Sequence, residues 1–350
     1  MSKETMHDFE SRRLPLKQLD GAPAALGFVG PDIPIEVLLA SGRSFGHLPW
    51  NTAATPAADR WLESGFPGWA RSILEQWHDG AFDGLHAVVF SRGDDASQRL
   101  FYYVRELQLR GELQGPQPLI FDIALIPRPS SLAHTAESVL ALAGALGVAQ
   151  DSLPRAIELG NGLRHRLQVL QQQRVGRGDH YARLARAALW SDPSSWLDDV
   201  AIASLPAAHR VLLAGSTPPD DRLHRAVEAG GASVIAEAHS HGLDRLGPPL
   251  EESDDPPQLR IARQLCRHAT GPRSFLDRAR WIVERAVTAR AAAVILWLTR
   301  EDEALAWQVP AQRKALAAAG IPALILPAAS WLADDEVLQR ITAYCQETFR

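Results

Sequence analysis

Short apolar runs that end at a glycine or a polar turn recur along this chain, and such runs are typical of buried parallel strands. The clearest run covers residues 211–214 and is followed by a Gly-Ser-Thr turn at 215–217. A helix over 221–229, with apolar positions four residues apart, then leads to a second run at 232–236. A strand, a turn, a helix and a strand in this order predict a βαβ unit.

Two further βαβ units with the same layout are predicted, one in each half of the chain. Right-handed crossovers of this kind place the connected strands parallel. The sequence therefore predicts an α/β fold with a small parallel sheet in each half. The elements of these two units are strands over 84–90, 119–124, 291–298 and 323–327 and helices over 96–109 and 309–319.

The remaining patterns divide the chain into four parts. These are a polar N-terminal arm (1–22), a first domain (23–129), a helical linking region (130–205) and a second domain (206–350). A tight turn is expected at 27–32 and an irregular segment at 44–58. Further helices are predicted over 33–41, 61–80, 132–146, 152–172, 179–189, 194–204, 258–269, 274–289 and 334–349.

Composition argues against several classes of function. The 350 residues are 46% hydrophobic and 22% charged, with a net charge of −5, so the chain can bury sizeable cores. No block of Lys and Arg is present, so neither nucleic acid nor an anionic membrane is an expected partner. No apolar run is long enough to span a bilayer, and the first residues lack the apolar segment of a signal peptide. We expect a cytoplasmic protein.

The predicted turns at the ends of strands are the candidate ligand site. Ligands in doubly wound sheets bind beyond the carboxyl ends of the strands, where backbone N–H groups and helix N-termini converge. The turns at 28–32, 91–95 and 215–219 all follow apolar runs and are expected to form one cleft, although any such turn can also be a simple connection. They contribute the candidates Gly30, Pro31, Arg92, Asp94, Asp95, Gly215, Ser216 and Thr217.

Several stretches, taken together and in order, resemble one family. They are Gly27 to Glu36, Asp83 to Leu100, Leu213 to Ser216, and Ala318 to Pro322. From about residue 27 to its C-terminus, the chain resembles the 2-hydroxyacyl-CoA dehydratase and benzoyl-CoA reductase subunits. The resemblance implies two Rossmann-like domains, a [4Fe–4S] cluster between them, a CoA thioester substrate, and pairing with a paralogous subunit or as a homodimer.

The sequence departs from this family where the cluster ligands are implied. The positions that the resemblance gives for cluster cysteines are Gly30, Phe66 or Pro67, and Gly93 or Asp94. None of these residues is a cysteine. The two cysteines of the chain, Cys266 and Cys345, lie in predicted helices away from these turns. Because such clusters are held by thiolates, we expect no iron–sulfur cofactor in this chain.

Two pairs of residues could each have either a chemical role or a purely structural one. Asp94 and Asp95 could form an acid/base pair, since two close carboxylates push their pKa values apart, or one of them could cap a helix. His239 and His241 could bind a metal with Asp244, or they could lie in a solvated loop. The spacing fixes no third strong ligand, so no metal site is assigned.

Arginines and aromatic residues supply the last candidates. Arg43, Arg92 and Arg245 could contact the phosphates of CoA, which favour bidentate guanidinium groups. His47, with Trp50, lies in the irregular segment that is expected to face the cleft. The helical tryptophans at 61, 69 and 77 are more typical of a core than of a cofactor platform. No residue is assigned a catalytic role.

Two classes of function stay open at this point. The chain could be a non-redox subunit of an acyl-CoA dehydratase or reductase complex, whose partner subunit bears the cluster. It could instead be a cluster-free paralogue that binds an acyl-CoA or a similar ligand without catalysis, or that acts only as a scaffold. A two-domain solute-binding protein has a similar cleft but is expected to carry an export signal. In the first two cases, we expect the isolated chain to be inactive as a dehydratase.

Overall fold

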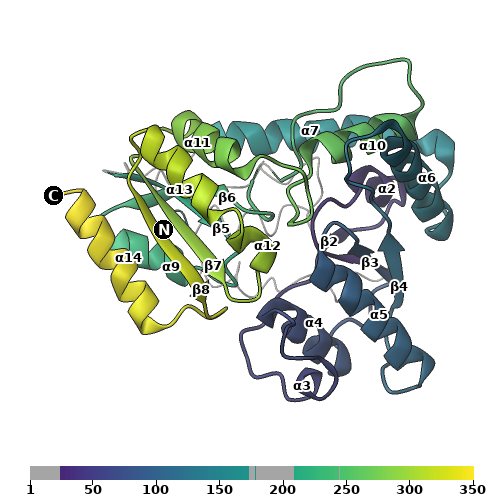
Figure 1. Cartoon of the computed structure of the whole chain (residues 1–350). Coiled ribbons are helices and arrows are strands. Elements are labelled where there is room, and N and C mark those ends of the chain that lie inside the picture. Colours follow the sequence, from purple (N-terminus) through teal and green to yellow (C-terminus); the bar gives the residue numbers. More distant parts are fainter. Residues whose placement is uncertain (1–23, 173–177, 179–208, 244) are drawn as a thin grey trace, which may run out of the picture.

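The computed structural model describes residues 24–172, 178, 209–243 and 245–350. Within these residues the strands form two four-stranded sheets in which all pairs are parallel. Helices cover the sheets, and the two parts face each other across the centre of the molecule (Figure 1). This confirms the predicted α/β class with two Rossmann-like domains. The predicted arm at 1–22 and the predicted helices at 179–189 and 194–204 lie outside the described residues.

The first sheet has the strand order β2-β1-β3-β4. Its strands are β1 (Leu26–Val29), β2 (Phe45–His47), β3 (Ala87–Ser91) and β4 (Gln117–Phe121). The sequence did not predict β1 and β2, because the first is four residues long and contains a glycine and the second has three residues. Gly27 does not form the predicted turn but lies in β1, where an added Cβ would come within 2.6 Å of Leu48 Cδ2.

Helices cover both faces of the first sheet. One face packs against α4 (Gly68–His78) and α5 (Asp95–Leu109). The helices on the other face are α2 (Ile35–Ala40), α6 (Pro129–Ala145), α7 (Leu153–Gln172) and α10 (Pro257–His268). Although α10 lies in the second half of the chain, its Ile261 shares a core with Leu26 of β1.

Crossing a bilayer requires a helix that is both long and apolar. No single helix in the described ranges meets that requirement. Helix α6 and the segment 150–172, which contains the 3-10 turn Gln150–Ser152 and α7, meet it only as a pair, and the pair is bent by 110°.

The second sheet repeats the same arrangement, with the strand order β6-β5-β7-β8. Its strands are β5 (Arg210–Gly215), β6 (Ser233–Ala238), β7 (Ala293–Thr299) and β8 (Ala323–Ala329). One face packs against α9 (Arg222–Ala229) and α14 (Asp335–Thr348), and the other against α11 (Arg278–Thr288) and α13 (Val309–Ala318). The short helices α3 (Ala58–Trp61) and α12 (Glu303–Ala306) lie in connecting segments.

Two helices begin later than the sequence pattern predicted. Helix α4 begins at Gly68 and not at residue 61, because Pro67 before it is extended, with φ −67° and ψ 154°. Helix α11 begins at Arg278 and not at residue 274, because Asp277 caps it by accepting a hydrogen bond from Arg280 N at 3.0 Å. Both late starts leave a segment of irregular backbone near the centre of the molecule.

The segment 270–273 joins the second half of the chain to the first sheet. The Asp32 carboxylate, in the turn after β1, accepts hydrogen bonds from Thr270 N at 2.8 Å and from Gly271 N at 3.1 Å. Arg273 donates to the Gln98 side chain at 2.8 Å. Gly271 is packed so closely that an added Cβ would lie 2.7 Å from Gly93 O. This segment therefore fills the space between the turns that follow β1 and β3.

Candidate functional site

A pocket lies where the carboxyl ends of the two sheets face each other. Its walls come from the turns that follow β1, β3, β5 and β7, the central strands of the two sheets. In each sheet these two strands flank the point at which the strand order reverses, where doubly wound folds bind ligands. The pocket is partly open to the surface, and its space of about 600 Å³ includes open solvent.

The structure brings together most of the residues that the sequence analysis selected. All three selected turns, at 28–32, 91–95 and 215–219, contribute to the pocket wall. The selected residues that line it are Gly30, Pro31, His47, Asp94, Gly215, Ser216, Thr217 and His241.

Five selected residues do not line the pocket. Arg43 donates to Ala24 O at 2.9 Å. Arg92 forms an ion pair with Asp122 at 2.5 Å, and Asp95 is an exposed residue at the start of α5. Arg245 donates to Gly242 O at 3.0 Å. His239 is buried behind the wall, with its Nδ1 3.4 Å from Thr217 Oγ1.

An aromatic group forms one side of the pocket. It consists of Trp50, Trp69, Trp331, His47 and His241. The Trp50 ring is stacked on Trp69 at a centroid distance of 6.2 Å and contacts Trp331 edge-on at 6.2 Å. Its centroid is 5.0 Å from that of His241. Trp69 packs against the core of the first domain, as its helical position predicted, and it also lines the pocket, where it is half-buried.

His47 is an uncharged member of this aromatic group. Burial lowers its pKa from 6.5 to about 4, so the ring is neutral at pH 7. Its Nδ1 lies 2.7 Å from Leu48 O, and since a carbonyl only accepts, Nδ1 carries the proton. The His47 and His241 rings are 4.4 Å apart. A neutral aromatic surface of this kind can stack on planar or apolar groups.

The carboxyl pair at the pocket is not the one that the sequence suggested. Asp94 caps α5 by accepting from Ser97 N at 2.7 Å, which confirms the capping alternative. Burial, followed by the charge of Asp302 and then of Asp95, raises the pKa of Asp94 to about 7. Asp302, which follows β7 across the pocket, has its pKa raised by burial. Asp94 and Asp302, from different domains, are therefore the two carboxyls of the pocket wall.

Asp302 is held by hydroxyl groups from both central strands of the second sheet. It accepts hydrogen bonds from Ser216 Oγ and from Thr299 Oγ1, the latter at 3.2 Å. Ser216 Oγ in turn accepts from Thr299 N at 2.9 Å. Sequence analysis missed Asp302. The available signal was its place just beyond the carboxyl end of an apolar strand, the same signal that selected Asp94.

Arg278 is the cation of the pocket, and the sequence analysis missed it as well. Its guanidinium donates to Thr270 O at 3.0 Å and to Gly271 O at 2.7 Å. The carboxylates of Asp32 and Asp302 both stabilise its charge, against a burial that lowers its pKa. Burial also raises the pKa of Asp32 to about 6. No sequence pattern marks Arg278, because arginine is frequent in the helices around it.

The described residues of the loop after β6 contact one another. Thr217 Oγ1 lies 3.1 Å from His241 Nδ1, and His241 N donates to His239 Nδ1 at 3.2 Å. Asp244, the third ligand considered, lies outside the described residues. Among the residues that are described, no group of three His, Cys, Asp or Glu side chains is placed to hold a metal ion.

Neither cysteine belongs to the pocket. Cys266, on α10, has its Sγ 3.7 Å from Ala124 O and 3.8 Å from Thr135 Oγ1, on the covered side of the first sheet. Cys345, on α14, is buried in the core beneath the second sheet. Burial raises the pKa of both thiols, that of Cys345 to about 11, so both are protonated at pH 7.

One comparison of the chain with known proteins gives a match. No protein with a curated description matches the chain. A sequence model of one family, described as 2-hydroxyglutaryl-CoA dehydratase, D-component, matches residues 32–345. The matched span contains the pocket-lining residues Asp94, Ser216, Arg278 and Asp302. The chain belongs to the 2-hydroxyglutaryl-CoA dehydratase D-component family.

Proposed function

We propose that this chain is a non-redox subunit of an acyl-CoA dehydratase or reductase complex, and that it holds no iron–sulfur cluster of its own. In this proposal the interdomain pocket binds a CoA thioester, and a paralogous subunit or a second copy of the chain completes the assembly. The chain belongs to the dehydratase family and has a pocket between two Rossmann-like domains. The observation that carries the proposal is that no cysteine is among the described residues that line this pocket.

The packing at the strand-end turns supports the absence of a cluster. Thiolates are the usual ligands of such clusters, and the residues at these turns offer none. A Cβ added at Gly30 would lie 2.8 Å from Ser97 Oγ, and one added at Gly93 would lie 3.0 Å from Asp32 Oδ2. The space that thiolates need there is filled by protein. The residues at these turns therefore do not fit the family's cluster.

The aromatic group and the polar groups opposite it support a thioester ligand. A mostly apolar wall with a few convergent polar groups is the usual lining of a small-molecule pocket. Trp331 lies on one side of the pocket, and Ser216, Thr217 and Arg278 lie among its polar residues. The hydroxyls and the guanidinium can donate to carbonyl or phosphate oxygens.

Iron analysis tests the redox part of the proposal. We expect chain purified without oxygen to contain iron and acid-labile sulfide at trace levels only, with no broad visible absorption. We also expect no dehydratase activity from the chain alone. About four irons per chain, the stoichiometry of a [4Fe–4S] cluster, would show that the chain carries a cluster and would contradict this part of the proposal.

Calorimetric titration with CoA and butyryl-CoA tests the pocket. Replacing Trp331 by Ala removes one wall and is expected to weaken butyryl-CoA binding about tenfold, the size of one aromatic stacking contact. Trp307→Ala is the matched control, because Trp307 is 84% exposed and does not line the pocket. Equal losses in both variants would place the ligand elsewhere. Thioester binding with no activity in any reconstituted complex would favour the cluster-free binding paralogue.

A further inference from the structure

One wall of the interdomain pocket is a tryptophan of the second domain that packs on the first. Trp331 follows β8 and lines the pocket together with Trp50 and Trp69 of the first domain. Its ring lies on Gly68, the first residue of α4, so closely that a Cβ added to this glycine would be 2.5 Å from Trp331 Cδ2. Position 68 therefore has room for the ring only because it is a glycine.

The ring of Trp331 is well packed, but its polar atom is not satisfied. Trp331 Nε1 is buried and has no hydrogen-bond partner in the described part of the chain. Trp77, in the core of the first domain, shows the usual arrangement, because its Nε1 donates to Gln114 O at 2.8 Å. A buried donor without an acceptor is unfavourable, and the same N–H would bind water if the ring left Gly68. Packing thus favours the position on Gly68, and hydrogen bonding opposes it.

The backbone is fixed on both sides of Trp331. Ala329 O accepts a hydrogen bond from Arg300 N at 3.1 Å, and Leu332 O accepts one from Arg222 Nη1 at 3.1 Å. A movement of Trp331 away from Gly68 is therefore mainly a rotation of its side chain.

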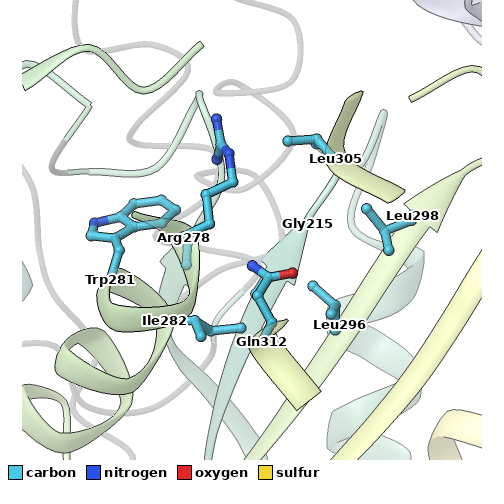
Figure 2. Close-up of a pocket in the computed structure, with 10 residues that line it drawn as sticks. Gly215, Arg278, Trp281, Ile282, Leu296, Leu298, Leu305 and Gln312 are labelled. Atoms are coloured by element: carbon cyan, nitrogen blue, oxygen red, sulfur yellow. The ribbon is translucent and has the colours of Figure 1, made fainter. Parts of the chain in front are cut away.

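Three other residues that the second domain contributes to the pocket wall are held in place (Figure 2). Arg278 donates to Thr270 O at 3.0 Å and to Gly271 O at 2.7 Å. Gly215 is the last residue of β5, and Leu305 belongs to α12. Trp331, by contrast, can leave its position without breaking a hydrogen bond of its side chain.

We propose that Trp331 is a gate of the interdomain pocket. With its ring on Gly68, the wall between the two domains is closed. When the side chain rotates away, this wall opens, the indole N–H reaches water, and Trp50 and Trp69 are uncovered. The gate does not depend on which molecule the pocket binds, so it goes beyond the proposed function and is tested on the chain without a ligand.

Fluorine NMR of the full chain labelled with fluorotryptophan tests the gate. The signals of Trp331, Trp50 and Trp77 are identified as those lost in Trp331→Phe, Trp50→Phe and Trp77→Phe. In the unmodified chain we expect the Trp331 signal to show exchange between two positions on the microsecond to millisecond timescale of lid motions. The signal of Trp77, whose indole N–H has an acceptor, is expected to show no such exchange.

Gly68→Ala is expected to hold the gate open, because the added methyl group takes the place of the ring. The Trp331 signal should then move to its released position. The Trp50 signal should shift more between light and heavy water, a difference that reports the exposure of its ring. Gly65→Ala is the matched control, three residues earlier, since no atom lies within 4 Å of an added Cβ there. It should change neither signal.

Thermal unfolding of the same variants separates a gate from a folding defect. Gly68→Ala should lower the Tm of the unmodified chain but not that of Trp331→Ala, in which the space is free and alanine favours the helix. A lower Tm in both backgrounds would contradict the proposed contact. If Gly68→Ala does not fold, the exchange of the Trp331 signal in the unmodified chain decides.

Three results of the NMR experiment would overturn the gate. They are a Trp331 signal without exchange in the unmodified chain, the same Trp331 signal in folded Gly68→Ala, and an equal shift in Gly65→Ala. Because no ligand is present in these measurements, their outcome is independent of whether the pocket binds a CoA thioester.

Discussion

At the scale of single residues, the electrostatics of the pocket depend on which carboxyl groups lie close together. Distance along the sequence does not predict which groups these are. Asp94 and Asp95 are adjacent in the chain, but successive residues at a helix start point in different directions, and Asp95 is exposed. The neighbour across the pocket is Asp302, which is brought there by the second sheet. Residues separated by two hundred positions meet only through the tertiary fold, so this pairing could not be read from one sequence.

The raised pKa of Asp94 predicts how the free energy of unfolding depends on pH. Its folded pKa of about 7 lies above the unfolded value of 3.8, so the folded state binds more protons between these pH values. The ionised side chain therefore destabilises the fold as the pH rises towards 7, and the penalty is complete above it. Asp94→Asn keeps the cap and removes the charge. We expect its advantage in free energy of unfolding to grow by about 2–3 kcal/mol from pH 5 to pH 8.

Urea denaturation at the two pH values measures this difference. Asp335→Asn is the control, because Asp335 is exposed and makes the same change of charge in the first turn of another helix, α14. A gain for Asp94→Asn that is the same at pH 5 and pH 8 would mean that the carboxyl does not titrate in the folded state as described.

At the scale of elements, the sequence predicted the long apolar strands and most helices but not the shortest strands. Strands β3, β5, β7 and β8 are apolar runs flanked by turns, and their existence follows from composition and length. Strand β2 has three residues and is stabilised by its pairing with β1, which leaves no periodic pattern to detect. The three predicted turns of the cleft were found because they follow strands. Trp331 lies just beyond β8 and had the same signal, but it was missed, whereas Arg278 begins a helix and follows no such rule.

The turn after β5 has room only for a glycine at position 215. Gly215 has a φ of +104°, and an added Cβ would lie 2.1 Å from Trp297 O on the neighbouring strand. Gly215→Ala must therefore displace β7 or the turn, and we expect it to lower the free energy of unfolding by about 3 kcal/mol or more.

Gly231→Ala is the matched comparison for that variant. Gly231 also has a positive φ, of +84°, but no atom lies within 4 Å of an added Cβ. Its cost is expected to be the backbone strain alone, about 1 kcal/mol. Urea titration of both variants measures the difference, and equal losses would show that the close approach to Trp297 does not limit the turn.

At the scale of the whole molecule, the two sheets are connected through the segment 270–273, and Asp32 is the residue that holds it. Asp32 has a φ of +59° and accepts two backbone N–H groups from the other half of the chain. Asp32→Ala removes both hydrogen bonds and strains the backbone. We expect a loss of about 3 kcal/mol, together with a calorimetric transition that broadens or splits, because the two domains then unfold less cooperatively.

Asp32→Asn separates the two causes. Asparagine tolerates the left-handed conformation and keeps an acceptor oxygen, so its loss should lie between those of the unmodified chain and Asp32→Ala. A single sharp transition for Asp32→Ala at the temperature of the unmodified chain would show that other contacts hold the domains together.

The equal strand order of the two sheets has a mechanical consequence for any ligand in the pocket. Each sheet contributes one half of the pocket wall, at the point where its strand order reverses. A ligand in the pocket therefore contacts both halves and loses contacts when they separate. By linkage, the free energy with which such a ligand binds is also the extra work required to pull the halves apart. A ligand in the pocket therefore connects the two sheets. The increase in the work needed to separate them reports how tightly that ligand is bound.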